Sequence, residues 1–360
     1  MNTALLRRGF LPDPDPLIRF GDDSEFAPLD TLGHDLPSLL HDRGCRAYLR
    51  GVTIPPLPDR DLPLPVLRLY YVRLGFLASA YVNQVGEERA TLLPRNLAVP
   101  LVEVCRRLRR PPILSYDGYA LYNWKRFDPN GPIALGNIDT IQNFVHLYDE
   151  HWFILVHVEI EAHAARLLRA IFGVQEALSR DDRPAADAAM RDLVRTIWDQ
   201  VAVLRRIPEK MDPNLYYKTF RPYIRFFENV VYEGIDSAPM NFRGETGAQS
   251  SVVPTLVAFL KIPHQPSMLT DHLADMRRFM PEEHRRFLAQ VEALPPVRGR
   301  VDDALFNEAL DALAAFRETH LGFAHDYIAR WESDPRGTGG TPYLKWLAQL
   351  IAETRAYKIA

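Results

Sequence analysis

The chain has 360 residues, of which 47% are hydrophobic and 25% are charged, a composition typical of a folded globular protein. Its formal net charge of −3 lacks the basic character that binding to DNA or RNA requires. Its two cysteines, Cys45 and Cys105, lack the close spacing of a zinc or redox motif and are too few for a disulfide framework, so a reducing compartment is expected.

The first part of the chain is punctuated by proline, with three prolines in residues 12–16 and five in residues 55–65. Residues 1–19 have no continuous apolar core, so no signal peptide is expected. No apolar run approaches the ~20 residues that cross a bilayer, and a protein of the cytoplasm without membrane contact is expected. Residues 66–82 are apolar and aromatic, which predicts a helix there.

A strong turn signal at Asp128-Pro129-Asn130-Gly131-Pro132 marks a predicted boundary. We therefore predict a small N-terminal mixed or helical domain over residues 1–132 and a large all-helical domain over residues 133–360. The fold class is mainly α. Apolar residues at helical spacing predict the following segments: 138–172, 184–206, 216–232 as one helix or two short ones, 250–260, 281–294, 302–331 and 343–357.

The long predicted helix over residues 302–331 carries a histidine of interest. Its apolar positions Phe306, Leu310 and Leu313 share one face with His320. A neutral imidazole pointing into an apolar helical bundle is a common ligand of haem iron. The alternative is a histidine that has a purely structural role in the core, and on pattern alone that alternative is the more common one.

A second histidine, His157, lies one turn after Phe153 on the apolar helix predicted over residues 138–172. It too could be a structural polar group in the core, or it could face the chemistry opposite His320. Residues 337–341, Gly-Thr-Gly-Gly-Thr, do not follow a predicted strand, so a nucleotide-binding loop is a weak interpretation. We interpret this segment as a loop that closes over a ligand.

Several segments, taken in order, resemble the indoleamine 2,3-dioxygenase family, which is related to tryptophan 2,3-dioxygenase. These segments are Pro111–Tyr116 with Asn123 and Trp124, Asp128–Asn130, Trp152–Ala162, Tyr232–Gly234, Gly244–Ser251, Asp275–Pro281 with His284 and Arg285, Arg317 with His320, and Gly337–Thr341. They cover about the last two-thirds of the chain, and the first hundred residues match only loosely.

The resemblance implies a haem b enzyme in which His320 is the proximal iron ligand. It further implies an ion pair of Arg317 with Asp275 near the proximal side, and a cofactor contact at Gly247. Phe153 would lie over the distal pocket. The resemblance also implies a set of residues around the indole and its amino acid portion: Tyr116, Tyr119, Ala120, Thr338, Gly339 and Thr341.

The resemblance has three departures. His157 stands where many indoleamine dioxygenases have serine and tryptophan dioxygenases have histidine, and it would orient the indole N–H first and accept its proton second. Aligning the Gly244 segment puts Met240 where well-studied members have an arginine that binds the substrate carboxylate, and Ile235 replaces an aromatic residue. A thioether cannot bind a carboxylate, and Arg243 is the candidate to take its place.

The function that the resemblance implies is haem-dependent cleavage of the indole C2–C3 bond of L-tryptophan by O2, giving N-formylkynurenine in tryptophan catabolism, the kynurenine pathway. The partners are then a small indole substrate and O2. A second hypothesis is insertion of one oxygen atom into a modified tryptophan in secondary metabolism. A third is a haem sensor or carrier. Monomer and homo-oligomer both remain open.

Overall fold

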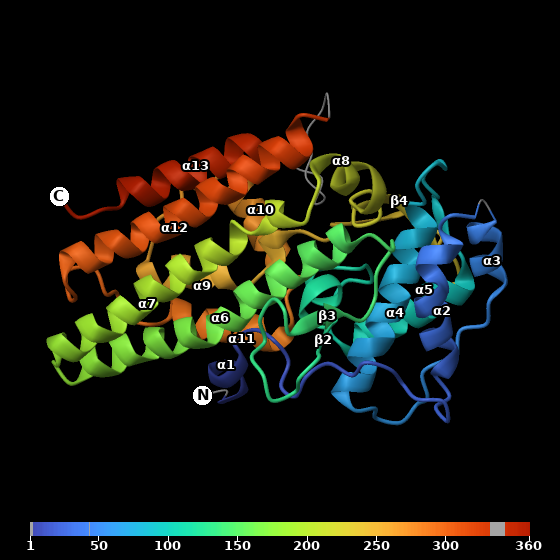
Figure 1. Cartoon of the computed structure of the whole chain (residues 1–360), viewed down its shortest axis with the longest axis horizontal. Helices are drawn as coiled ribbons and strands as arrows, with labels where there is room; N and C mark the ends of the chain where they lie inside the picture. The colour runs from blue at the N-terminus through green and yellow to red at the C-terminus, as the bar shows by residue number, and fades with distance from the viewer. Residues whose placement is uncertain (1–2, 43, 332–342) are drawn as a thin grey trace.

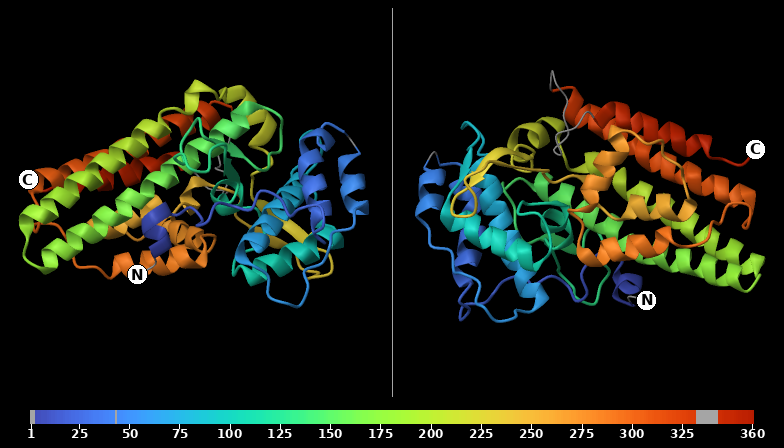
Figure 2. Two further views of the ribbon diagram at one scale, coloured as in Figure 1. Left: turned by 60° about the horizontal axis from the view of Figure 1, so that its bottom comes forward. Right: turned by 180° about the vertical axis from the view of Figure 1, so that it is seen from behind.

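The computed structural model describes residues 3–42, 44–331 and 343–360, and it is mainly helical, as the sequence predicts. The four helices between residues 27 and 107 gather at one end of the molecule and a long helical bundle forms the other (Figures 1 and 2). At the first end lie α2 (Ala27–Leu39), α3 (Cys45–Gly51), α4 (Leu64–Val82) and α5 (Arg95–Arg107). Within the described part of the chain, no helix is both long and apolar enough to cross a membrane.

The bundle is built on a 32-residue helix, α6 (Tyr148–Ser179). It packs along α7 (Arg183–Leu204), which packs on α12 (Asp303–Ala324), and α12 packs on α13 (Tyr343–Ala356) (Figure 1). Asp182 caps α7 by accepting a hydrogen bond from the backbone N–H of Ala185 at 3.1 Å.

Shorter helices complete the bundle on its other side. They are α8 (Pro213–Leu215), α9 (Val252–Leu260), α10 (Met268–Arg277) and α11 (Glu282–Glu292). The α4, α9, α11, α12 and α13 predictions match the structure to within a few residues at each end, except that α12 stops short of residue 331. The remaining turns of that segment form a π-helix, η5 (His325–Ala329).

Two predictions of helix are wrong in part. Residues 138–140 form strand β3 (Ile138–Thr140), which pairs antiparallel with β2 (Trp124–Arg126), so α6 begins ten residues later than predicted. The predicted helix over residues 216–232 contains only the π-helix η3 (Tyr216–Phe220), and then β4 (Phe227–Tyr232). The second segment contains the β-branched and aromatic residues Phe227, Val230, Val231 and Tyr232, which favour strands, and pairing with neighbouring strands satisfies its backbone.

Strand pairing crosses the predicted boundary between residues 132 and 133. Besides the β2–β3 pair, β1 (Leu92–Leu93) runs parallel to β4, and β4 runs antiparallel to β5 (Met240–Phe242). The N-terminal helix α1 (Thr3–Arg8) packs on α6 of the bundle. The division into two domains stays a prediction, but segments from both sides of it share their cores.

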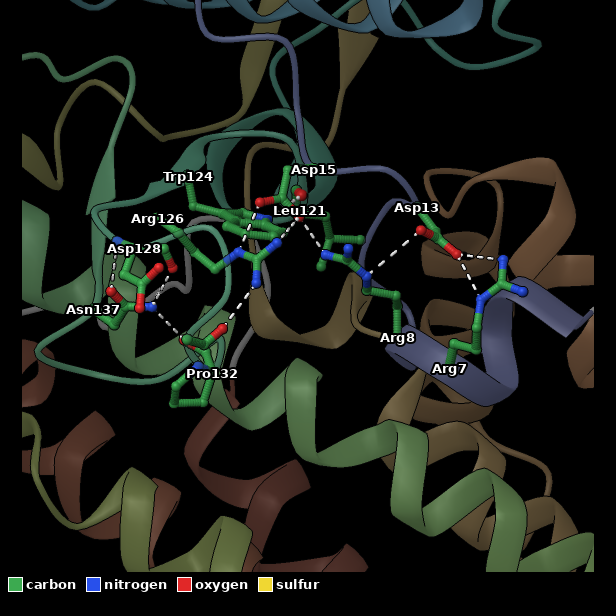
Figure 3. A network of polar contacts seen from close by, with 11 residues as sticks. Arg7, Arg8, Asp13, Asp15, Leu121, Trp124, Arg126, Asp128, Pro132 and Asn137 are labelled. Atoms are coloured by element: carbon green, nitrogen blue, oxygen red, sulfur yellow. Dashed lines mark hydrogen bonds and ion pairs between the residues drawn. The ribbon is translucent and has the colours of Figure 1, made fainter.

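An ionic network holds the first segment of the chain against β2 (Figure 3). The Asp15 carboxylate accepts hydrogen bonds from Arg126 at 2.8 and 3.0 Å and also from Arg8. Arg7 donates to Asp13 at 2.9 and 2.5 Å. Arg126 in turn donates to the Gly131 carbonyl at 2.8 Å, in the turn between β2 and β3. The N-terminal segment is thereby tied to the hairpin that leads into α6.

Candidate functional site

Rings from three segments surround Phe153 on α6. Its ring centre lies 4.6 Å from that of His157, 5.5 Å from Tyr216, 6.1 Å from Phe220 and 6.3 Å from Tyr119. The Tyr116 ring meets His157 edge-on at 5.9 Å. We call these six side chains the aromatic cluster: Tyr116, Tyr119, Phe153, His157, Tyr216 and Phe220.

The aromatic cluster depends on two π-helical turns. Tyr119 belongs to η1 (Asp117–Leu121), with Tyr116 just before it, and Tyr216 and Phe220 belong to η3. Ala120 is buried in η1 beside Tyr119. Phe153 and His157 are only half-buried although they lie at the middle of the chain's packed core. Partly open rings at such a depth indicate a space that a planar ligand can fill.

His157 has a fixed tautomer when it is neutral. Its Nδ1 lies 2.7 Å from the Phe153 carbonyl oxygen, which can only accept, so Nδ1 carries the proton. Burial lowers the pKa of His157, and the neutral ring is therefore the form expected at neutral pH. Its Nε2 then presents a lone pair, which can accept a hydrogen bond from an N–H group.

His320 near the end of α12 combines two properties that rarely occur together. Its side chain is exposed, yet the surrounding protein lowers the pKa of the ring to about 4, mainly through burial and also through the charge of His157. The surrounding groups therefore favour the neutral imidazole while part of the ring stays accessible. The described part of the chain makes no hydrogen bond to this ring, so a neutral imidazole with an available lone pair is present there.

The expected ion pair of Arg317 with Asp275 is absent from the described residues. Asp275 pairs instead with Arg243 at 3.1 Å and with Arg278 at 3.2 Å. Arg317 is buried and donates to the Leu350 carbonyl at 2.8 Å and to the Thr354 hydroxyl. One turn before His320, Arg317 therefore fastens α12 to α13. Cofactor contacts by Arg317 and Asp275 stay predictions.

Gly247 opens the short 3-10 helix η4 (Gly247–Gln249) and is exposed. No atom lies within 4 Å of the position that a Cβ would occupy there. The segment that carries it is held to the aromatic cluster, because Gln249 accepts from the Tyr116 backbone N–H at 3.0 Å and donates to the Gly244 carbonyl at 2.9 Å. The predicted contact of Gly247 with a cofactor stays a prediction, and the space for it is present.

Three buried carboxyl groups border the aromatic cluster, and sequence reasoning did not single them out as functional residues. Glu150 accepts from the Tyr119 hydroxyl at 3.1 Å, and Glu161 accepts from the Tyr116 hydroxyl at 2.9 Å. Burial raises the pKa of both to about 7 and the pKa of Glu245 to about 8. Nothing in the spacing of the sequence marks these residues, because their burial is a property of the fold.

Arg221 was also missed. It directly follows η3, is 2% exposed, and its guanidinium lies over the Tyr217 ring at 5.2 Å. Its charge acts on the hydroxyl of Tyr216 in the aromatic cluster, lowering a pKa that burial raises. A buried arginine beside an aromatic site is a typical partner of a carboxylate. The run Tyr216-Tyr217 followed by Phe220-Arg221 is the signal that could have found it.

Ile235 is exposed after β4. Met240 lies on β5, paired with Val230, and packs against the core cluster that contains Tyr116 and Tyr119. The alignment of Met240 with a carboxylate-binding arginine stays a prediction. Arg243 pairs with Asp275 and lines a separate pocket of about 340 Å³, so its role in substrate binding stays a prediction. Thr338, Gly339 and Thr341 lie outside the described residues.

A family model for indoleamine 2,3-dioxygenase matches residues 5–357 of the chain. The chain belongs to the indoleamine 2,3-dioxygenase family. It is 30% identical to indoleamine 2,3-dioxygenase 1 of Mus musculus, over 93% of this chain and 89% of the mouse protein. It is 30% identical to the indoleamine 2,3-dioxygenase of Saccharomyces cerevisiae, over 89% and 78% of the two chains. A 6-hydroxytryptophan 2,3-dioxygenase of Fusarium equiseti is 28% identical over 90% and 83%.

As a member of the indoleamine 2,3-dioxygenase family, the chain is an oxidoreductase, a haem-dependent dioxygenase of tryptophan or a related indole. The residues present fit the cofactor. His320 is a neutral, accessible histidine whose ring has no hydrogen bond to the described residues, and open space adjoins Gly247. His320 would hold the iron, because a neutral imidazole is the usual proximal ligand of a haem that binds O2.

Proposed function

We propose that this indoleamine 2,3-dioxygenase cleaves the C2–C3 bond of L-tryptophan with O2 to give N-formylkynurenine, using haem b held by His320. Both atoms of O2 enter the product and no group leaves, so the product mass exceeds the substrate mass by two oxygen atoms. The observation that supports the proposal is that the neutral, accessible His320 lies near His157, which belongs to the aromatic cluster. The haem, when bound, supplies the activation of O2.

The aromatic cluster positions the indole. Phe153 and Tyr116 offer ring faces and edges to a flat bicyclic substrate, and Tyr119 and Ala120 close the wall behind it. His157 Nε2 accepts a hydrogen bond from the indole N–H and so sets which edge of the ring turns towards the cofactor. Holding the reacting atoms in place and excluding water are the protein's part of the catalysis.

The amino acid portion of the substrate lies towards η3 in this proposal. Arg221 binds the carboxylate there, because its guanidinium is buried beside Tyr216 of the aromatic cluster. Thr338, Gly339 and Thr341 close over the same portion, and Arg243 serves at the outer rim. With Arg221 in the site, Met240 no longer argues against tight binding of tryptophan.

We place the enzyme in the cytoplasm, and the thiols support this. Cys45 and Cys105 are buried and free, and burial raises their pKa values to about 11 and about 12. Neutral buried thiols of this kind are inert and are compatible with a reducing compartment.

The experiment that tests the proposed function follows absorbance and product mass together. The haem-loaded protein is reduced without oxygen and then receives L-tryptophan and O2. Formation of N-formylkynurenine, with two added oxygen atoms, supports the proposal. A product with one added oxygen supports the alternative of single-oxygen insertion. An intact haem spectrum without any product from L-tryptophan or 6-hydroxytryptophan contradicts the proposal and favours a haem sensor.

A further inference from the structure

Glu245 is fixed between two parts of the substrate site by its backbone. Its N–H donates to the Ile224 carbonyl at 3.0 Å, just after the segment that carries Arg221. The preceding residue, Gly244, packs so closely that a Cβ there would lie 2.4 Å from the Ile224 oxygen. On the other side, Gln249 joins the Gly244 carbonyl to the Tyr116 backbone. The position of Glu245 is therefore set by the fold rather than by a mobile loop.

The side chain of Glu245 lies among the tyrosines of the aromatic cluster. It is 3% exposed, and its charge acts on the hydroxyls of Tyr116, Tyr119 and Tyr216. These three rings come from both walls of the cluster and all lie next to Phe153 or His157. A buried carboxyl group that acts on all three lies near the aromatic cluster, to which Gln249 ties its segment through the Tyr116 backbone.

The carboxyl of Glu245 lacks the partners that its neighbours have. Glu161 accepts from Tyr116 and from Ser250, and Glu150 accepts from Tyr119 and two backbone N–H groups. Across residues 3–42, 44–331 and 343–360, no donor forms a hydrogen bond with the Glu245 carboxyl, and its raised pKa has burial as its cause. A buried carboxyl without a donor is costly unless a ligand supplies one.

The charges around the cluster show which ligand group fits. Arg221 and Glu245 both act on the hydroxyl of Tyr216, one lowering its pKa and the other raising it, after the dominant effect of burial. One buried cation and one buried acid therefore lie near Tyr216 of the aromatic cluster. An α-amino acid carries the complementary pair, a carboxylate and an ammonium, and an ammonium offers up to three donors.

We propose that Glu245 binds the ammonium group of the substrate and so selects indoles that carry a protonated amine. This inference rests on the proposed indole site and names one further determinant of its specificity. Glu245 accepts hydrogen bonds from the ammonium in its carboxylate form, and the proton that it holds in the free enzyme leaves to solvent on binding. Glu245 acts on the hydroxyls of Tyr116, Tyr119 and Tyr216, and Arg221 and Tyr343 also act on the hydroxyl of Tyr216.

The test compares three probes on haem-loaded protein: L-tryptophan, tryptamine, which keeps the amine but lacks the carboxylate, and indole-3-propionate, which lacks the amine. We expect Glu245→Gln to lower the ratio of kcat/KM for L-tryptophan to that for indole-3-propionate by at least about tenfold, the effect of losing one charge-assisted contact. Tryptamine should lose its advantage over indole-3-propionate in the same way. Glu150→Gln is the matched control, since its carboxyl is satisfied by the protein, and it should leave that ratio unchanged.

A second measurement needs no variant. Calorimetric titration of the wild-type protein without O2, at pH 7 in buffers of different ionisation enthalpy, should show release of close to one proton per L-tryptophan bound, and none with indole-3-propionate. An unchanged selectivity ratio in a folded, haem-loaded Glu245→Gln protein overturns the inference, as does equal proton release with both probes. If L-tryptophan binds with proton release but is never oxygenated, the proposed reaction fails while the ammonium site stands.

Discussion

The side chain of His320 is accessible although burial lowers its pKa, and its role can be tested by substitution. Its ring makes no hydrogen bond with the described residues and is kept neutral by burial, so replacing it removes an iron ligand without breaking a protein contact. We expect His320→Ala to fold but to lose stable haem, measured as the Soret absorbance per protein after gel filtration. His325→Ala, at an exposed histidine one turn further on, is the control and should keep its haem. A haem-loaded His320→Ala protein with an unchanged spectrum would contradict the assignment.

His157 could act on the indole N–H as a hydrogen-bond acceptor or as a general base, and the two roles differ in how much they contribute to kcat/KM. As an acceptor of the indole N–H it contributes one neutral hydrogen bond, so His157→Ser should keep haem and lower kcat/KM for L-tryptophan by about two- to tenfold. As an obligatory general base it would contribute about 10²- to 10⁴-fold. Steady-state kinetics separate the two ranges. With 1-methyl-L-tryptophan, which has no indole N–H, the acceptor role predicts no difference between the two proteins in kcat/KM.

At the same scale, the sequence predicts residue types better than it predicts directions. The resemblance implied that His157, Phe153, Tyr116 and Tyr119 belong to one site, and their rings are neighbours in the structure, while their roles stay predictions. The carboxylate-binding arginine was sought near Met240 by counting back from the Gly244 motif. Arg221 directly follows the π-helix η3, nineteen positions before Met240, and only the fold shows that it is buried beside the aromatic cluster.

At the scale of elements, residues 244–249 pack tightly against residues 224–226, and this contact positions Glu245 next to the aromatic cluster. A Cβ at Gly244 would lie 2.4 Å from the Ile224 oxygen and 2.5 Å from the Arg225 carbonyl carbon, all backbone atoms that cannot turn away. We expect Gly244→Ala to lower the free energy of unfolding by about 1–3 kcal/mol, the usual cost of overpacking.

Gly247→Ala is the matched control for that change, because no atom lies within 4 Å of its Cβ position. Differential scanning calorimetry of the haem-free proteins should show a lower Tm for Gly244→Ala and no loss for Gly247→Ala. A Tm for Gly244→Ala equal to that of the parent protein would mean that the two segments part more easily than their contacts indicate.

The helices themselves were predictable wherever an apolar stripe runs for many turns, as in α7, α11 and α12. The errors fall where local pattern and tertiary pairing disagree. Residues 138–140 and 227–232 have apolar spacing that suits a helix, but their backbone groups form hydrogen bonds with other strands of the chain. Such partners are 10 to 139 positions away in the sequence, so the apolar spacing within one segment does not reveal them.

Over the whole molecule, buried ionisable groups make stability depend on pH. Glu150, Glu161 and Glu245 have pKa values raised from 4.5 to about 7, 7 and 8, so the folded state binds more protons than the unfolded chain between these limits. Their contribution is fully present below pH 4.5 and is lost as pH rises through 7 and 8. Buried histidines, whose pKa values fall from 6.5 to about 4, have the opposite effect, but only below pH 6.5: His272, His284 and His320.

Above pH 6.5 only the carboxyl groups act, so we expect the free energy of unfolding to fall by on the order of 3 kcal/mol between pH 6.5 and pH 8.5. Urea denaturation across this range measures it. Glu245→Gln should flatten the dependence by about half, since its pKa lies highest. Stability that rises over this interval would show that the three groups are already ionised in the folded protein at pH 6.5.

The overall arrangement was only partly predictable. A mainly helical protein with a smaller N-terminal part follows from proline placement and helical periodicity. The sequence does not show that α1 packs on α6, or that Asp15 and Arg126 close a network 111 positions apart. These contacts join the first residues of the chain to the bundle and to strand β2. Composition does not show which arginine will pair with which aspartate.

The π-helical turns give the substrate site an unusual kind of adjustability. A π-turn holds one residue more than an α-turn, and three lie at Asp117–Leu121, Tyr216–Phe220 and His325–Ala329. Losing one residue from such a turn leaves an unbroken α-helix but rotates everything on one side of it by about 100°. A single-codon deletion near Tyr216 would therefore exchange the side chains presented to the indole while sparing the scaffold, a short evolutionary path from one indole substrate to another.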